Sequence, residues 1–211
     1  MPLSDAQIER YSRQIILPEI GGAGQERLLA ATVELHGVGP LAAMAARYLA
    51  GAGVGHLRLV DDDGDAAALR EELSALNPEC VVTRGGAADD ATVTLALDLP
   101  VAGLDALVHA GVPQLIAAGT GGDGGWLHSG DAGCAGCAAR AAAARTPAAS
   151  PLAAPAGGVV AGLVTLAVLR ALLDLAPDDG STWWRFNAAS AGLESRPLDR
   201  VSDCGACARP S

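Results

Sequence analysis

Four of the five cysteines form two C-x-x-C pairs, Cys134 with Cys137 and Cys204 with Cys207. Each pair sets two thiols on a tight turn, and two pairs supply the four sulfur ligands that structural zinc takes at about 2.3 Å in tetrahedral geometry. The competing interpretation is a redox C-x-x-C, which uses a single pair. The ligand count favours a structural zinc staple that joins residues 134–137 to 204–207. Such a closed site stabilises a fold and leaves no open position for catalysis.

A second chemical signal is the glycine-rich stretch Gly37-Val-Gly-Pro-Leu-Ala42, which follows a short β-type run at 32–36. Loops of this kind between a strand and a helix bind phosphate through backbone N–H groups. Pro40 has no N–H, although proline in the first turn of a helix leaves the helix start intact. We therefore expect the loop to keep its shape and to lose one phosphate donor.

The elements that must position these groups alternate between helix and strand. Helical patterns cover 5–13, 23–30, 41–50, 66–77 and 157–175, with a glycine-rich turn at 21–24 and a helix-forming alanine stretch from 137. Strand patterns cover 32–36, 56–60, 80–84, 92–98, 114–119, 124–128 and a pair within 182–196. Alternation of this kind indicates βαβ units. It predicts an α/β fold with a Rossmann-like, doubly wound, mostly parallel sheet, a C-terminal antiparallel extension and a zinc knuckle.

Length and composition limit the class of protein. A chain of 211 residues, half of them hydrophobic, is long enough for one domain over 1–211, with an N-terminal helical arm at 1–30. The net charge of -10 argues against a nucleic-acid partner, which demands a basic face. The apolar run at 154–169 is short for a membrane span, so we expect a core helix. The polar N-terminus lacks a secretory pattern, so we expect a cytoplasmic protein.

Several motifs together resemble the ThiF/MoeB/HesA family, the E1-like group that adenylates the C-terminus of ubiquitin-like and sulfur-carrier proteins. They are ERYSRQIIL at 9–17, the glycine loop, YLAGAGVGHLRLVD at 48–61 and the two cysteine pairs. The resemblance implies a Rossmann-like homodimer with zinc in the knuckles. The implied partner is a small ubiquitin-like or sulfur-carrier protein or a peptide.

The same resemblance implies the nucleotide contacts. Arg13 matches the arginine that reaches across the family's dimer to the ATP phosphates, and Asp61 matches the acid that takes the ribose hydroxyls. Gly37 and Gly39 belong to the phosphate loop. Mg·ATP is the cofactor that these four residues would hold.

The chain also departs from the family pattern. The family loop reads Gly-x-Gly-Gly-x-Gly, and a later Asn-x-x-Arg-Gln segment and lysine hold the triphosphate. This chain has fourteen arginines and no lysine, and Asp65 falls where the lysine is expected. Of the family's Asp-x-x-Asp-Asn element only Asp98 remains. An anion in place of a cation has the wrong sign for stabilising charge on a phosphate.

Three hypotheses follow for the function. The first is a degenerate, shortened E1-like protein that binds a carrier or peptide partner and has lost adenylation. The second is an active, shortened adenylyltransferase that holds Mg·ATP with Arg13, Asp61 and the loop amides. The third is an NAD-dependent oxidoreductase, because Gly37-x-Gly39-x-x-Ala42 followed by Asp61 formally satisfies the dinucleotide fingerprint. The sequence leaves open whether the chain is an enzyme.

Overall fold

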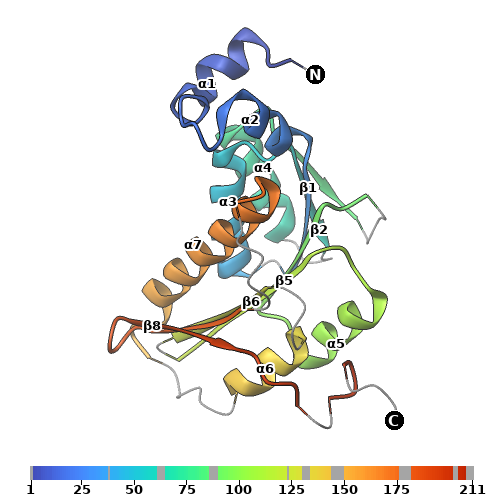
Figure 1. Ribbon diagram of the computed structural model, residues 1–211, viewed down its shortest axis with the longest axis vertical. Helices are drawn as coiled ribbons and strands as arrows, with labels where there is room; N and C mark the ends of the chain where they lie inside the picture. The colour runs from blue at the N-terminus through green and yellow to red at the C-terminus, as the bar shows by residue number, and fades with distance from the viewer. Residues whose placement is uncertain are drawn as a thin grey trace.

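A single eight-stranded sheet organises the chain, as the computed structural model shows (Figure 1). The structure describes residues 2–37, 39–60, 65–85, 90–122, 124–129, 134–143, 150–175, 182–201 and 204–207. The helices are α1 (Asp5–Ile15), α2 (Gly21–Ala30), α3 (Pro40–Ala52), α4 (Asp65–Leu76), α5 (Val101–Ala110), α6 (Ala135–Ala143) and α7 (Ala153–Leu172). The strands are β1 (Thr32–His36), β2 (His56–Val60), β3 (Val81–Arg84), β4 (Val93–Leu97), β5 (Leu115–Gly121), β6 (Gly124–Ser129), β7 (Thr182–Asn187) and β8 (Gly192–Pro197).

The sheet is doubly wound, which confirms the predicted fold class. Its order is β3-β2-β1-β4-β5-β6-β7-β8. Strands β3, β2, β1, β4 and β5 are parallel, and β6, β7 and β8 continue the sheet as an antiparallel extension. From β1 the chain moves outward to β2 and β3, whereas from β4 it moves to β5 on the other side. The neighbours β1 and β4 therefore form the topological switch point, where sheets of this type bind ligands.

Helices cover the two faces of the sheet with separate cores. The larger core joins α3, α4 and α7 to one face, and the smaller joins α5 and α6 to the other. In β4, Leu95 and Leu97 point into the larger core while Ala96 between them points into the smaller one. This two-residue period on a strand buried on both faces explains why its sequence is apolar except for Thr94.

Three helices differ from the sequence prediction. Helix α5 lies over 101–110 and was not predicted. Helix α2 starts at Gly21, so the predicted turn at 21–24 is wrong, and α7 starts at Ala153 rather than at 157. Gly24 of α2 is buried. A Cβ at this position would lie 3.2 Å from Cδ2 of Leu173, just beyond the end of α7. Close packing against α7 outweighs the weak helix propensity of the glycines.

Helix α7 is the long apolar helix of the fold. Its 20 residues have a mean hydropathy of 1.7, so by length and composition it is long enough to cross a membrane. In the structure it packs against α3, β5 and β6, running diagonally across the sheet (Figure 1). Core residues such as Val160, Val164 and Val168 are fully buried. This packing agrees with the predicted core helix.

The N-terminal arm is attached at the amino ends of the strands. Tyr11 of α1 is 2% exposed and lies against the turn after α3, where a Cβ on Gly53 would lie 2.7 Å from its ring. Gly53 has φ +91, which glycine adopts without strain. Asn77, at the end of α4, donates from Nδ2 to Tyr11 Oη at 2.9 Å and to the Ala50 carbonyl at 2.7 Å. The GAGVG motif thus serves packing of the arm.

A methyl group at Gly55 is expected to destabilise the protein, because the Cβ would lie 1.8 Å from the Leu29 carbonyl oxygen, which is backbone of α2. Overpacking of this kind costs about 1–3 kcal/mol. Urea unfolding of Gly55→Ala measures this cost. Gly51→Ala is the matched control, since nothing lies within 4 Å of its Cβ position and alanine in a helix gains about 0.5–1 kcal/mol. Equal stability of the two variants would contradict the described packing.

Candidate metal and nucleotide sites

The four paired cysteines form one cluster. All four sulfur atoms lie within 4.8 Å of one another, and all four thiols are free. The Sγ atoms of Cys134 and Cys204 are 3.5 Å apart, and those of Cys137 and Cys207 are 3.4 Å apart. Sulfur atoms at the corners of a tetrahedron with bonds of about 2.3 Å would be about 3.8 Å apart, so the set fits a single tetrahedral metal ion. The structure brings together the residues that the sequence paired, and the cluster can bind a metal ion.

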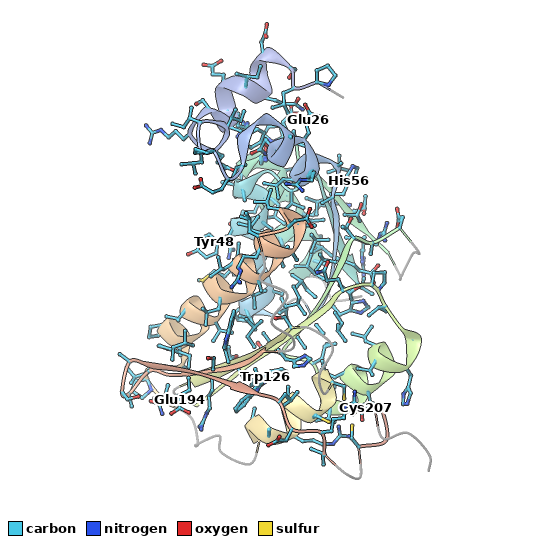
Figure 2. All side chains as sticks on the ribbon, in the orientation of Figure 1. Glu26, Tyr48, His56, Trp126, Glu194 and Cys207 are labelled. Carbon is cyan, nitrogen blue, oxygen red and sulfur yellow. The ribbon has the colours of Figure 1, made fainter. Side chains whose placement is uncertain are left out.

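Two segments far apart in the chain supply these thiols. Cys134 directly precedes α6 and Cys137 lies in its first turn, whereas the other pair follows β8 near the C-terminus (Figure 2). The Val201 N–H donates to Cys137 Sγ at 3.5 Å. Trp183 of β7 packs against the cluster and is 5% exposed. The cluster therefore joins the C-terminal segment to α6 and to the antiparallel extension.

Thiol acidity is uneven in the cluster. Burial raises the pKa of Cys204, but hydrogen bonds from the backbone N–H groups of Cys207 and Ala206 and from the neighbouring thiols together lower this pKa to about 7. Burial raises the pKa of Cys134 to about 11. Metal ions bind thiolates, so metal binding at neutral pH must release protons from this set.

The candidate nucleotide site lies at the switch point. Gly37 follows β1 with φ +97, and a Cβ there would lie 2.2 Å from the Leu97 carbonyl oxygen of β4. Only glycine allows this approach between the two strands. Gly39 is the residue before α3, gives no side-chain cap, and is followed by Pro40 at the first helical position. Gly37 thus has a structural role, the nucleotide contacts of Gly37 and Gly39 stay predictions, and Pro40 takes the place of one backbone donor.

Asp98 lies at the carboxyl end of β4, across the switch point from Gly37. It has φ +53, in the left-handed region. Its Oδ1 accepts hydrogen bonds from the Thr120 N–H at 2.6 Å and from Thr120 Oγ1 at 3.0 Å. Burial raises the pKa of Asp98, and the two Thr120 hydrogen bonds oppose that change. Sequence reasoning did not find Thr120, because a cross-strand partner depends on register.

Replacement of Asp98 by asparagine is expected to change how stability depends on pH. Because the folded-state pKa is raised above its ordinary value of 3.8, the ionised carboxylate destabilises the folded state. Wild-type stability relative to Asp98→Asn should fall as the pH rises from 3.8 through the raised pKa and then stay constant. Urea unfolding of both proteins over a pH series measures the difference. If the stability of wild type rose relative to that of Asp98→Asn with rising pH, burial would not be the dominant influence on the Asp98 pKa.

Two arginines, on α3 and on β2, are bound by carboxylates. Arg47 of α3 donates to both carboxylate oxygens of Glu72 on α4. Arg58 of β2 contacts Glu34 at 3.3 Å and Asp90 at 2.7 Å. The 1% exposed Glu34 thereby has its charge compensated on the sheet face opposite α3. Neither arginine is positioned as a ready phosphate ligand.

Arg13 is not brought to this site within one chain. Arg13 is exposed on α1, which packs at the amino ends of the strands, whereas Gly37 lies at a carboxyl end. Asp61 lies outside the described residues. Arg70 is exposed on α4.

A cavity of about 190 Å³ opens beside Thr120, between the β5–β6 hairpin, β7 and the end of α6. Small residues form much of its lining: Gly121, Gly124, Gly125, Ala142 and Ala143. Trp126 and Phe186 add aromatic surface, and Arg185 adds a cation. Because Thr120 also contacts Asp98, the cavity lies close to the switch point.

Sequence comparisons agree with the motif resemblance. The profile of the ThiF family matches residues 11–64. The chain is 34% identical to the adenylyltransferase and sulfurtransferase MOCS3 of Bos taurus over 252 aligned positions, which cover 97% of this chain and 54% of that protein. It is 51% identical to the SAMP-activating enzyme E1 of Haloferax volcanii over 63 residues, 30% of this chain and 23% of that protein. The chain thus spans about half the length of bovine MOCS3. The alignment to it is longer than the chain, so the relative contains segments with no counterpart here.

Solved structures share the fold. Escherichia coli MccB with succinimide superposes with a TM-score of 0.73 at 21% identity, covering 94% of this chain and 74% of that one. MccB with ATP gives a TM-score of 0.72 at 18% identity, covering 97% and 74%. This chain belongs to the ThiF family and is an E1-like protein of the ThiF/MoeB type.

Proposed function

We propose that this protein binds the C-terminal tail of a ubiquitin-like, sulfur-carrier or peptide partner and has lost ATP-dependent adenylation. The observation that carries the proposal is the loop between β1 and α3. Gly37 directly follows β1 and Gly39 directly precedes α3, but Pro40, which has no N–H, occupies the first helical position. The scaffold is kept while one of its phosphate donors is absent.

The described residues do not fit Mg·ATP well. Adenylation needs cations and metal-binding carboxylates around the phosphates. The chain has no lysine, and Arg47 and Arg58 are held in ion pairs. The described acid, Asp98, accepts two hydrogen bonds from Thr120. These features support a protein that has kept partner binding without the chemistry.

The cavity beside Thr120 supports the partner proposal. Its glycine and alanine lining leaves room for an extended backbone rather than for bulky side chains. Arg185, Asn187 and the Trp126 ring offer charge, hydrogen bonds and apolar surface to such a tail. Names of the relatives support the class of partner, since they include a SAMP-activating enzyme and MccB structures with MccA.

A homodimer belongs to the same proposal. Arg13 lies on α1 at the opposite end of the strands from Gly37, so within one chain it lies away from the phosphate loop (Figure 1). A second copy could present its arm to this loop. The exposed apolar residues Ile8, Ile16 and Leu17 on and after α1 give that arm surface to bury against a partner copy.

Zinc is the metal that we propose for the cysteine cluster. A closed set of four thiols with tetrahedral spacing is the donor set of structural zinc. When bound, the ion would link Cys204 and Cys207 to α6 and stabilise the fold without taking part in a reaction.

An active adenylyltransferase is the second candidate. Two observations favour it. The N–H groups of Leu41 and Ala42 remain at the start of α3, and proline at this position is compatible with the loop's shape. The second observation is that these relatives are named adenylyltransferases.

Carrier titrations separate the two candidates. The full chain would be titrated by calorimetry with a panel of ubiquitin-like and sulfur-carrier proteins, with and without Mg·ATP, and with the same carriers lacking their C-terminal tails. The proposal predicts binding that needs the tail and not ATP, with no exchange of pyrophosphate into ATP. Carrier-dependent pyrophosphate exchange would establish the active enzyme instead.

A further inference from the structure

An ion pair between α5 and α6 contacts the cysteine cluster. Arg140 of α6 lies three residues after Cys137. Its Nη1 donates to Asp105 Oδ1 at 3.1 Å, and its Nη2 donates to Asp105 Oδ2 at 2.7 Å. The same Nη1 lies 3.6 Å from Cys204 Sγ. The guanidinium thus bridges a carboxylate on one helix and a candidate metal ligand near the C-terminus.

The ion pair between Arg140 and Asp105 is partly buried. The side chains of Arg140 and Asp105 are 33% and 19% exposed. The pair crosses the first turn of α6 at Gly136, where a Cβ would lie 2.0 Å from Asp105 Oδ1 and 2.7 Å from Arg140 Nη1. The glycine between the two cysteines of the first knuckle therefore makes room for the pair. A side chain of any size at this position would displace it.

The positive charge of Arg140 is favourable beside a metal site. Four thiolates around a divalent ion carry a net charge of -2, and burial makes uncompensated charge costly. A guanidinium that donates to a ligand sulfur lowers this cost and fixes the ligand's orientation, as outer-shell groups do at metal centres. The bidentate contact to Asp105 holds the planar guanidinium in the required direction.

We propose that Arg140, oriented by Asp105, is a positioning residue that raises the metal affinity of the four-cysteine site through Cys204. The inference rests on the metal site proposed above and adds two residues to it. It also explains why α5 and α6 pack as a pair beside the knuckle. His109 of α5 makes a second contact to this region, with its Nε2 3.1 Å from the Gly205 carbonyl oxygen.

Competition with a zinc-binding chelator tests the proposal on the full chain. Arg140→Leu should bind zinc about 10- to 100-fold more weakly than wild type, the range found for outer-shell changes. Arg140→Lys, which keeps the charge but not the fork, should recover part of that loss. Arg47→Leu is the matched control, because it removes an arginine from another bidentate interhelical pair, with Glu72, away from the cysteines. It should leave zinc affinity unchanged.

Cobalt spectra and a double mutant separate positioning from misfolding. The sulfur-to-cobalt charge-transfer band of Arg140→Leu should keep the intensity of four thiolates, which an unfolded or three-ligand site would lose. Gly136→Ala should weaken zinc binding in wild type and less in Asp105→Ala, since removing the carboxylate removes the nearer clash and frees the Arg140 side chain to move away.

Two distinct results would overturn the inference. Equal zinc affinity of Arg140→Leu, Arg47→Leu and wild type would leave the metal site standing and refute the role of Arg140. A wild-type chain that binds no zinc or cobalt would refute the metal site itself and this inference with it.

Discussion

Cys137→Ser is expected to abolish stoichiometric metal binding and to lower the free energy of unfolding by about 4 kcal/mol. That value is the stabilisation that a ligand gives at a free concentration about 1,000-fold above its Kd. Cys137 is fully buried, and its sulfur also accepts the Val201 N–H. Loss of this ligand frees the C-terminal segment from α6 and exposes the core around Trp183. Metal analysis and urea unfolding at fixed zinc measure both effects.

Chelation provides an independent version of the same test. A strong chelator should lower wild-type stability to that of Cys137→Ser and should not affect the variant further. Cys80→Ala is the matched control, because Cys80 is also buried but its thiol lies in the core of the sheet, with a pKa that burial raises to about 11. It should cost stability without changing metal content. If the chelator left the stability of wild type unchanged, the proposal that a bound metal ion stabilises the fold would be contradicted.

Asn77→Ala is expected to cost about 1–3 kcal/mol and to loosen the N-terminal arm. The Asn77 side chain is 1% exposed and satisfies three groups: Tyr11 Oη, the Ala50 carbonyl and, through Oδ1, the Glu79 N–H. Alanine leaves the buried Tyr11 Oη without this partner, whereas the Ala50 carbonyl still accepts the Gly53 N–H and Glu79 is exposed. A buried orphan costs about 1–3 kcal/mol. Urea unfolding gives the total, and limited proteolysis near α1 reports release of the arm.

Two further variants make the Asn77 prediction specific. Tyr11→Phe should cost less in the Asn77→Ala background than in wild type, since the hydroxyl has then already lost its partner. Asn187→Ala is the matched control, because the Asn187 side chain accepts one exposed hydrogen bond from the Ser190 N–H. The account of the arm would be wrong if Asn77→Ala cost no more than Asn187→Ala.

Most of the fold could be predicted because its signals are local. A strand buried on both faces, such as β4, is mostly apolar, and α3 starts at a proline and ends at Gly53. Helix α5 escaped prediction because it is apolar on most sides, and its signals were limited to Pro100 before it and Gly111 after it. Gly24 shows the opposite case, in which contact with α7 decides the local structure.

Among the site residues, too, those with local sequence signals were predictable and those that depend on tertiary structure were not. The cysteine cluster was predictable because C-x-x-C spacing brings each pair together locally, and the ligand count then joins the two pairs. Thr120 and Asp105 were not predictable, because their roles depend on strand register and on the position of α5. Arg13 shows a third limit, since its predicted contact needs a second copy of the chain.

The most direct test of lost adenylation is calorimetric titration of the zinc-loaded protein with Mg·ATP, with Asp61→Ala as the control. The account predicts no heat of binding up to millimolar ATP in either protein, because the loop lacks the Pro40 donor and the chain lacks the lysine. Saturable binding in the micromolar range that disappears in Asp61→Ala would contradict it and would favour the active adenylyltransferase.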